Sequence, residues 1–600
     1  MRKTISLLLL FAYMLPFTVL GQTSVDTQVK RVEQGLLPAV LIKGDPSFTL
    51  EERMKQWKVP GLSVAVVKDF KVEWARSYGI KDIESKEPVT TETLFQAGSI
   101  SKPVAAMVAL KRVQQGKITL DENINNKLVT WKLPDNEFTA KKKVTLANLL
   151  SHTAGLTVHG FPGYAVDEKV PTLPQVLDGT EPANTAAVRV DMEPGTKFRY
   201  SGGGTTIAQL AIMDIEKKPY PQIAKETVLG PLNMTNSTYS QPLPDDWRKK
   251  AASGHRGDGA LVAGKIHVYP EMAAAGLWTT PTDLAKFGIE VQLSYAGKSN
   301  KVLPKELIDK MVTPFMEQVG LGFFIDKRGN SVYFGHDGAD EGFRAMMLMH
   351  REKGYGAVIM VNSDNGQIMP EVMRSIAREY NWDEFLPAVN ELISLDAATL
   401  DQYVGRFQVN PDRILTVARE EGKLIVRPTA DLKFELLPVA DGTFIRREGV
   451  LTYRFVKGAA GVSELKVTLP AGNIVTAAKV AADALIPFEH LNAGNFEKAL
   501  AGYRQIKKDT PDNAAINQAR INGLGYGYMR AKKMPEALFY FKLNVEFYPN
   551  DSDVYDSLGE GYMTNGDKEL AIANYKKSLE LNPKNTNAAE ALKKLNGAQN

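Results

Sequence analysis

The sequence of 600 residues predicts three regions of different fold class: a mixed α/β region, a small antiparallel β domain and an all-α repeat array. Three observations predict this order. Residues 22–390 mix helical and strand patterns with many glycines, residues 398–480 alternate with the period of a strand, and residues 484–600 repeat with helical spacing. A chain of this length is also too long for one hydrophobic core, which favours several domains.

The first segment is typical of a secretory signal peptide. Arg2 and Lys3 precede an apolar run over residues 5–19, and Val19 and Gly21 are the small residues that precede a cleavage position. The run is short for a membrane span, so a membrane anchor is the weaker alternative. We therefore expect residues 1–21 to be removed and the mature protein to be periplasmic or secreted, without a stable membrane span.

Composition and charge exclude several classes of function. The formal net charge is +4 and the sequence shows no basic stripe, which argues against a nucleic-acid partner. The chain has no cysteine, so disulfides, thiol catalysis and a lipidated N-terminus are excluded. No cluster of histidines and carboxylates has the spacing of a metal site, and we expect neither a metal nor another cofactor.

Ser99 and Lys102 form the pattern Ser-x-x-Lys where an amphipathic helix is expected to start. We expect Ser99 to cap this helix and Gly116 to end it, with Pro103 tolerated in the first turn. Positions three apart share a helix face, so the Lys102 amine can reach the Ser99 hydroxyl. Burial promotes the loss of a proton from a lysine, which can then act as a base.

A second Ser-x-x-Lys pattern, at Ser463 and Lys466, lies on a predicted strand. Positions three apart on a strand face opposite sides, so this pair is rejected as a nucleophile and base.

Further motifs follow Ser99 in a fixed order. Tyr200 opens the tripeptide Tyr-Ser-Gly, and His336, Asp337 and Gly338 follow an apolar predicted strand over residues 332–334. Together with Ser-x-x-Lys and the stretches 149–156, 230–232 and 276–281, these motifs resemble the serine β-lactamase, DD-peptidase and esterase family over roughly residues 59–380. The chain is most similar to the class C-like, penicillin-binding-protein-like branch, which implies an α/β, two-lobed β-lactamase/transpeptidase-like domain.

The resemblance implies a role for each of these residues. Ser99 attacks a carbonyl and is acylated, while Lys102 and Tyr200 transfer its proton to the leaving group. The backbone amides of Ser99 and Ala339 form an oxyanion hole, which stabilises charge as it develops. His336 lies where other members carry a lysine, adding a hydrogen bond or a positive charge near the substrate.

Two departures from the family pattern concern the substrate. Gly202 replaces the asparagine of the Tyr-x-Asn motif, which removes an amide that holds the substrate in relatives. Asp337, next to Gly338, stands where threonine or serine is common, and an aspartate repels a substrate carboxylate unless Arg344 faces the site and offsets it. Both changes argue against an efficient β-lactamase.

Three other candidates rank lower. His255 also fits His-x-Gly but lacks a preceding apolar strand. His152 is interpreted as a structural residue that holds a turn after a short helix. Ser201 is not a nucleophile in a Gly-x-Ser-x-Gly elbow, because Arg199 occupies the position of the first glycine.

Residues 398–480 contain five short strand patterns separated by turns such as Asp441-Gly442. They predict a small antiparallel barrel or sandwich without catalytic residues. In residues 484–600, Ala537 and Ala571 are 34 positions apart, as are Pro549 and Pro583. This period is typical of TPR repeats, whose stacked helices usually offer a groove to a protein or peptide, so a protein partner is expected as one option.

The sequence therefore predicts an exported serine hydrolase that forms a covalent acyl-enzyme on an amide or ester. The expected substrate is a D-amino-acid-containing or peptidoglycan-type peptide or a β-lactam. A carboxylesterase acting on small esters is one alternative, and a lapsed hydrolase that serves as a TPR scaffold is the other.

Overall fold

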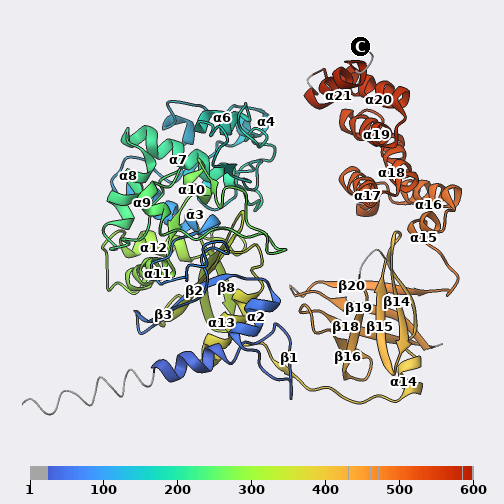
Figure 1. Ribbon diagram of the computed structural model, residues 1–600, viewed down its shortest axis with the longest axis horizontal. Helices are drawn as coiled ribbons and strands as arrows, with labels where there is room; N and C mark the ends of the chain where they lie inside the picture. The colour runs from blue at the N-terminus through green and yellow to red at the C-terminus, as the bar shows by residue number, and fades with distance from the viewer. Residues whose placement is uncertain (1–24, 430–431, 460, 471, 584, 598–600) are drawn as a thin grey trace, which may run out of the picture. The chain divides into compact units, whose positions relative to one another are not determined.

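The computed structural model describes residues 25–429, 432–459, 461–470, 472–583 and 585–597 (Figure 1). The chain forms two compact units, one comprising the segment up to Pro38 together with Asp45–Ala388, and the other comprising Ala39–Gly44 together with Val389–Asn600. The predicted signal peptide at residues 1–21 lies outside the described residues. Across the described ranges, no helix combines the length and apolar character that crossing a membrane would need.

A six-stranded antiparallel sheet lies at the centre of the first unit. Its order is β3 (Lys71–Gly79), β2 (Gly61–Lys68), β11 (Gly356–Val361), β10 (Phe343–His350), β9 (Ser331–Asp340) and β8 (Phe324–Arg328). Side chains alternate between the two faces of a strand. In β2, Val64 and Val66 enter one core while Ala65 and Val67 enter another. Both faces of this sheet are therefore buried.

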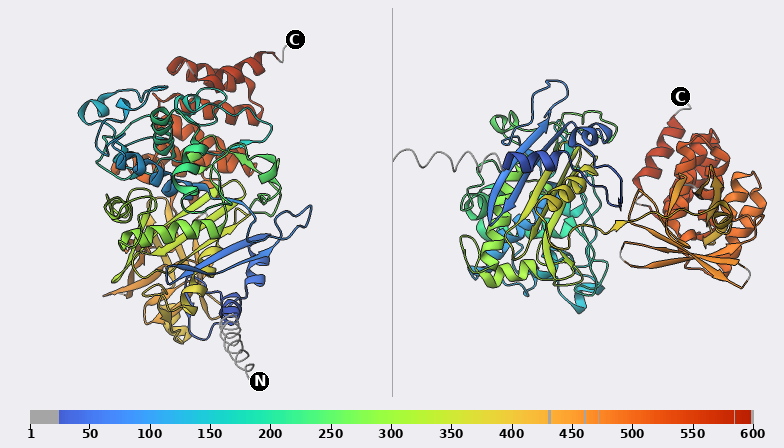
Figure 2. Two further views of the ribbon diagram at one scale, coloured as in Figure 1. Left: turned by 90° about the vertical axis from the view of Figure 1, so that its left-hand side faces the viewer. Right: turned by 90° about the horizontal axis from the view of Figure 1, so that it is seen from below.

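Helices cover both faces of the sheet (Figure 2). The helix over residues 25–33, α2 (Leu50–Gln56) and α13 (Ile368–Glu379) share one apolar core with the first face. On the other face, α11 (Pro281–Tyr295) and α3 (Ser101–Gln114) share the larger core. This helix–sheet–helix layering fits the predicted α/β fold class.

Shorter elements complete the first unit. They are β4 (Phe95–Gln96), η1 (Gly98–Ile100), η2 (Ile124–Asn126), α4 (Glu137–Lys141), α5 (Leu146–Leu150), β5 (Tyr164–Ala165), α6 (Leu173–Asp178), α7 (Gly202–Glu216), α8 (Tyr220–Ala224), η3 (Lys225–Leu229), α9 (Asp245–Arg248), β6 (His267–Val268), α10 (Met272–Ala275), β7 (Trp278–Thr279) and α12 (Lys305–Val312). β4 pairs with β7 and β5 pairs with β6. Most of the helices among them belong to a helical lobe beside the sheet (Figure 1).

The second unit contains a closed antiparallel barrel. Its strands are, in order, β13 (Gly405–Asn410), β14 (Arg413–Glu420), β15 (Lys423–Pro428), β16 (Phe434–Ala440), β17 (Thr443–Ile445), β18 (Thr452–Gly458), β19 (Gly461–Thr468) and β20 (Ile474–Val480). The short helix α14 (Ala397–Asp401) precedes them. Phe407, Phe444 and Leu465 are buried in the barrel core. The predicted small antiparallel domain is confirmed, and of its two predicted forms the barrel is the one observed.

The rest of the second unit is helical, as predicted. Its elements are α15 (Pro487–Asn492), α16 (Phe496–Asp509), η4 (Ala514–Ile516), α17 (Gln518–Arg530), α18 (Met534–Phe547), α19 (Ser552–Asn565), α20 (Lys568–Leu581) and α21 (Thr586–Gly597). The starts of α17 and α19, Gln518 and Ser552, lie 34 positions apart, as do those of α18 and α20, Met534 and Lys568. The assignment to the TPR class stays a prediction.

A buried polar group joins the barrel to the helices within this unit. The Tyr503 hydroxyl of α16 donates to Asp412 Oδ1 over 2.8 Å and lies 2.9 Å from the Tyr540 hydroxyl of α18. Asp412 follows β13 and is 1% exposed. Burial raises its pKa to about 6.

One N-terminal segment groups with the second unit rather than the first. β1 (Leu41–Ile42) pairs in parallel with β12 (Val389–Asn390), and Val40 and Ile42 pack against Leu437 and Ile445 of the barrel. The predicted domain of residues 22–390 had included this segment, because a contact between positions so far apart leaves no local pattern.

Candidate active site

Ser99 lies in the 3-10 turn Gly98–Ile100, directly before α3. α3 begins at Ser101, with Ile100 at its N-cap position and no side chain capping it. The prediction that Ser99 caps the helix is therefore wrong. The extra 3-10 turn separates Ser99 from the helix start and leaves its hydroxyl for another bond.

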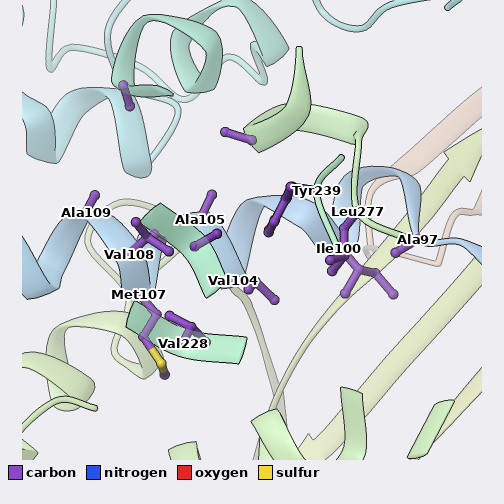
Figure 3. Packing of buried hydrophobic residues seen from close by; sticks show 14 of the residues in the cluster. Ala97, Ile100, Val104, Ala105, Met107, Val108, Ala109, Val228, Tyr239 and Leu277 are labelled. Carbon is purple, nitrogen blue, oxygen red and sulfur yellow. The ribbon is translucent and has the colours of Figure 1, made fainter. Parts of the chain in front are cut away.

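The helix behind Ser99 is anchored in the apolar core. Ile100 and Val104 are fully buried, and they lie with Tyr239 and Leu277 in the packing shown in Figure 3. The Tyr239 hydroxyl also donates to the Ser101 carbonyl over 2.8 Å. This packing holds the turn that carries Ser99 in one position, which a nucleophile requires.

Lys102 is hydrogen-bonded to the predicted nucleophile. Its Nζ donates to Ser99 Oγ over 2.8 Å and to the carbonyl oxygen of Ala274, in α10, over 2.8 Å. Lys102 is only 4% exposed. The side-chain amine and hydroxyl are therefore within reach of direct proton transfer, largely shielded from water.

Tyr200 lies beside this pair. Its ring centroid is 4.9 Å from Lys102 Nζ, and the ring stacks on His152 with centroids 4.2 Å apart. Ser201 caps α7 with a side chain that accepts from the Gly204 amide, which fixes the backbone next to Tyr200. In the described part of the chain, the Tyr200 hydroxyl has no hydrogen-bond partner of its own.

His152 supports the Tyr200 loop, a role that the sequence did not indicate. It follows α5 with a φ of +56°, as expected for a residue that holds a turn. Its Nδ1 accepts from the Ser201 amide over 3.2 Å. Burial, with the nearby Lys102 charge, lowers its pKa well below the usual value, so the ring is a neutral acceptor.

His336 faces the same cluster from β9. Its ring centroid is 6.1 Å from that of Tyr200 and 5.1 Å from that of Phe324, and the side chain is 5% exposed. Burial, followed by the Lys102 charge, lowers its pKa to about 3. The ring is therefore neutral at pH 7, and of the two predicted contributions only a hydrogen bond is available.

The tautomer of His336 follows from its partner. Nδ1 lies 2.6 Å from the Asp337 carbonyl oxygen, which can only accept, so Nδ1 carries the proton. Nε2 is buried without a partner among the described residues. This nitrogen is left as a hydrogen-bond acceptor beside Tyr200.

Two glycines let the Ser99 turn approach β9 closely. A Cβ on Gly338 would lie 1.9 Å from the Ala97 carbonyl oxygen, and one on Gly98, where φ is +50°, would lie 2.5 Å from the Ala339 amide nitrogen. Only glycine fits at either position. The turn that carries Ser99 thereby lies against the backbone of β9 at Ala339, and the oxyanion hole formed by their two amides stays a prediction.

Asp337 and Ala339 are exposed on β9, whereas His336 and Gly338 are buried. No described residue forms an ion pair with Asp337. The Arg344 guanidinium is 2.9 Å from Asp364 and donates to the Asp340 carbonyl. Arg344 is thus committed elsewhere and does not offset Asp337.

The position of the missing asparagine is filled by an aromatic ring. A Cβ on Gly202 would lie 3.0 Å from the edge of Phe161 and 3.2 Å from the His159 carbonyl oxygen. A longer side chain at 202 therefore has no room unless Phe161 moves. Phe161 and Phe324 belong to no motif, and no signal in the sequence points to either of them.

Two buried carboxyl groups lie outside the predicted set. Glu271, before α10, is fully buried, and Asp340, at the end of β9, is 5% exposed. Neither carboxyl group accepts a hydrogen bond from another side chain among the described residues. Burial raises the pKa of Glu271 to about 8 and holds that of Asp340 well above its usual value. Nothing in the sequence pattern distinguished them from surface acids.

The rejected candidates lie in ordinary structural positions. Ser463 and Lys466 are on β19. His255 is fully buried, with Nδ1 2.9 Å from the Asn362 carbonyl oxygen. Over the ranges that the structure describes, no three histidine or acidic side chains are grouped to hold a metal ion.

Comparison with known proteins gives matches over more than half of the chain. The family model described as Beta-lactamase matches residues 49–379. Protein flp from Staphylococcus aureus (strain N315) is 23% identical over 373 residues, which cover 60% of this chain and 69% of that protein.

Two solved structures also match the chain. The octameric penicillin-binding protein homologue from Pyrococcus abyssi has a TM-score of 0.49 and 21% identity, over 71% of this chain and 98% of its own. The D-amino acid amidase from Ochrobactrum anthropi SV3, complexed with L-phenylalanine, has a TM-score of 0.46 and 22% identity, over 59% of this chain and 99% of its own. Since the family model spans more than half of the sequence, the chain belongs to the beta-lactamase family, whose members are serine hydrolases.

Proposed function

We propose that this protein is an exported serine hydrolase that acts on an amide or ester through an acyl-enzyme at Ser99. One observation carries the proposal: Lys102 Nζ lies 2.8 Å from Ser99 Oγ inside a buried environment. A surface lysine beside a helix-capping serine would not be 4% exposed and bonded to a backbone carbonyl from another helix as well.

The reaction proceeds in two steps. In the first, Ser99 Oγ attacks the carbonyl carbon, its proton passes to Lys102, and the amides of Ser99 and Ala339 bind the oxyanion. Tyr200, whose ring centroid is 4.9 Å from Lys102 Nζ, relays this proton from Lys102 to the leaving group as the carbon–leaving-group bond breaks. In the second step, water attacks the ester, a proton of this water passes through the same pair to Ser99 Oγ, and the bond between the acyl carbon and Oγ breaks.

His336 and Gly338 have supporting roles in this scheme. The neutral His336 can accept a hydrogen bond at Nε2, either from the Tyr200 hydroxyl or from a hydroxyl or amide of the substrate. Gly338 admits the Ser99 turn to β9. Asp337, exposed beside them, lines the substrate side.

The proposed substrate is a D-amino-acid-containing or peptidoglycan-type peptide or a β-lactam, and a carboxylesterase is the second candidate. The loss of the amide at Gly202 and the unpaired Asp337 favour the second candidate over an efficient β-lactamase. The lapsed-hydrolase alternative is disfavoured because Ser99, Lys102 and Tyr200 are all present and grouped.

Domain organisation and location complete the proposal. We propose a signal peptide at residues 1–21, a hydrolase domain at 22–390, a barrel at 398–480 and TPR repeats at 484–600, in a periplasmic or secreted protein. The TPR repeats would offer a site for a protein partner, which a pull-down with the full-length mature chain can test.

Intact mass after incubation with a fluorophosphonate, and separately with a penicillin, tests the chemistry. Wild type is expected to gain one phosphonyl adduct that is absent in Ser99→Ala and strongly slowed in Lys102→Met. A penicillin adduct would favour a peptidoglycan peptidase or β-lactamase, and phosphonylation alone would favour an esterase or amidase. Absence of both adducts from folded wild type would contradict the proposal.

A further inference from the structure

The unpaired carboxylate of Asp337 is close to the proposed oxyanion hole. Asp337 and Ala339 are two positions apart on β9 and share its exposed face. Two strand positions span about 6.6 Å. Because the Ala339 backbone lies against the Gly98 turn, the Asp337 backbone is about two residue lengths along β9 from the place where the oxyanion hole is proposed.

Asp337 is open to a ligand. Its side chain is exposed, although the protein around it displaces enough water to raise the pKa of its carboxyl group.

The cations nearest to this strand do not neutralise Asp337. Arg344 is bound to Asp364, and the buried Lys102 donates to Ser99 and Ala274. His336 is neutral at pH 7. The negative charge of Asp337 is therefore not neutralised within the described part of the chain, and it would repel a substrate that placed a carboxylate beside it.

We propose that Asp337 binds a free ammonium group of the substrate, so that the site prefers amides or esters of amino acids with an unblocked amine over substrates that present a carboxylate at this position. The inference rests on the proposed function and narrows its substrate class. It makes Asp337 a specificity-determining residue.

Competition against fluorophosphonate labelling of Ser99 tests this proposal in the full-length mature protein. D-alaninamide carries the ammonium group, and N-acetyl-D-alaninamide is its neutral counterpart. In wild type, the concentration of D-alaninamide that halves the labelling rate is expected to be roughly tenfold lower than the concentration of N-acetyl-D-alaninamide that does so. This factor is about what one partly screened ion pair contributes to binding. Asp337→Asn and Asp337→Thr are expected to remove this difference, and each rate is normalised to labelling of the same variant without competitor.

Asp121→Asn removes an exposed carboxylate from another part of the first unit and serves as the matched control. It is expected to keep the tenfold preference. Equal protection by the two compounds in wild type, or a preference that survives in either Asp337 variant, would overturn the proposal. Wild type that takes up no fluorophosphonate would instead refute the proposed function itself, so the two failures are distinguishable.

Discussion

Gly338→Ala is the sharpest test of how the site is assembled. The added Cβ would lie 1.9 Å from the Ala97 carbonyl oxygen, whereas ordinary contact begins at 3.4 Å. The Ser99 turn and β9 must therefore separate by about 1.5 Å, the difference between these two distances. A displacement of about 1 Å at a reacting centre costs on the order of 100-fold in rate, or about 2.7 kcal/mol.

The assay is the second-order rate of fluorophosphonate labelling of Ser99, followed by intact mass. Gly338→Ala is expected to label about 100-fold more slowly than wild type while remaining folded, since overpacking costs about 1–3 kcal/mol of stability. Gly527→Ala is the control, because a Cβ at that helical position meets no atom within 4 Å. Labelling of a folded Gly338→Ala within threefold of wild type would show that the close approach of β9 does not position the oxyanion hole.

Three further predictions concern groups described above. Burial raises the pKa of Glu271 to about 8 from an ordinary 4.5, so the folded state retains a proton that the unfolded state loses, and stability falls as pH rises from about 4.5 to 8. Glu271→Gln should therefore raise the melting temperature relative to wild type by more at pH 8.5 than at pH 5, and an equal difference at both pH values would contradict this. The pKa of Asp412 is raised to about 6 from 3.8, so the stability of wild type should likewise fall as pH rises from about 4 to 6. The melting temperature of Asp412→Asn, measured relative to wild type, should therefore rise over that window and stay level above it. A difference that does not change with pH would show that the pKa of Asp412 is not raised. Gly202→Asn should slow fluorophosphonate labelling of Ser99 by at least tenfold, because the new side chain meets Phe161. The double variant Gly202→Asn with Phe161→Ala should recover most of the lost labelling rate. No recovery in the double variant would show that Phe161 does not fill the asparagine position.

The features that could be predicted from the sequence are those that depend on residues close together in the chain. The predicted turn Asp441-Gly442 lies directly between β16 and β17, because a turn between alternating stretches is a local signal. The pair Ser99 and Lys102 is likewise contained in one turn. β20 was missed: most of its side chains are exposed, so its hydrophobic alternation is weak.

The supports of the site are non-local, and for that reason they were not predicted. His152 and Tyr200 stack across 48 positions of sequence, and neither residue type reveals the contact. The start of α3 was misplaced because Ser99 is a favourable cap by type, whereas packing of Gly98 against β9 sets the turn. The neutral state of His336 likewise depends on burial, which only the assembled fold defines.

The pairing of β1 with β12 has a consequence for how the chain can be cut. The backbone passes between the two units three times, at residues 38–39, 44–45 and 388–389. A protease that cleaves at the last of these crossings leaves Leu41–Ile42 hydrogen-bonded to Val389–Asn390, and the first unit stays covalently attached to that strand. A single nick therefore yields two fragments that are still joined by this strand pairing, and a hydrolase unit expressed alone needs residues 25–38 as well as Asp45–Ala388, because Val29, Val32 and Leu36 belong to its core.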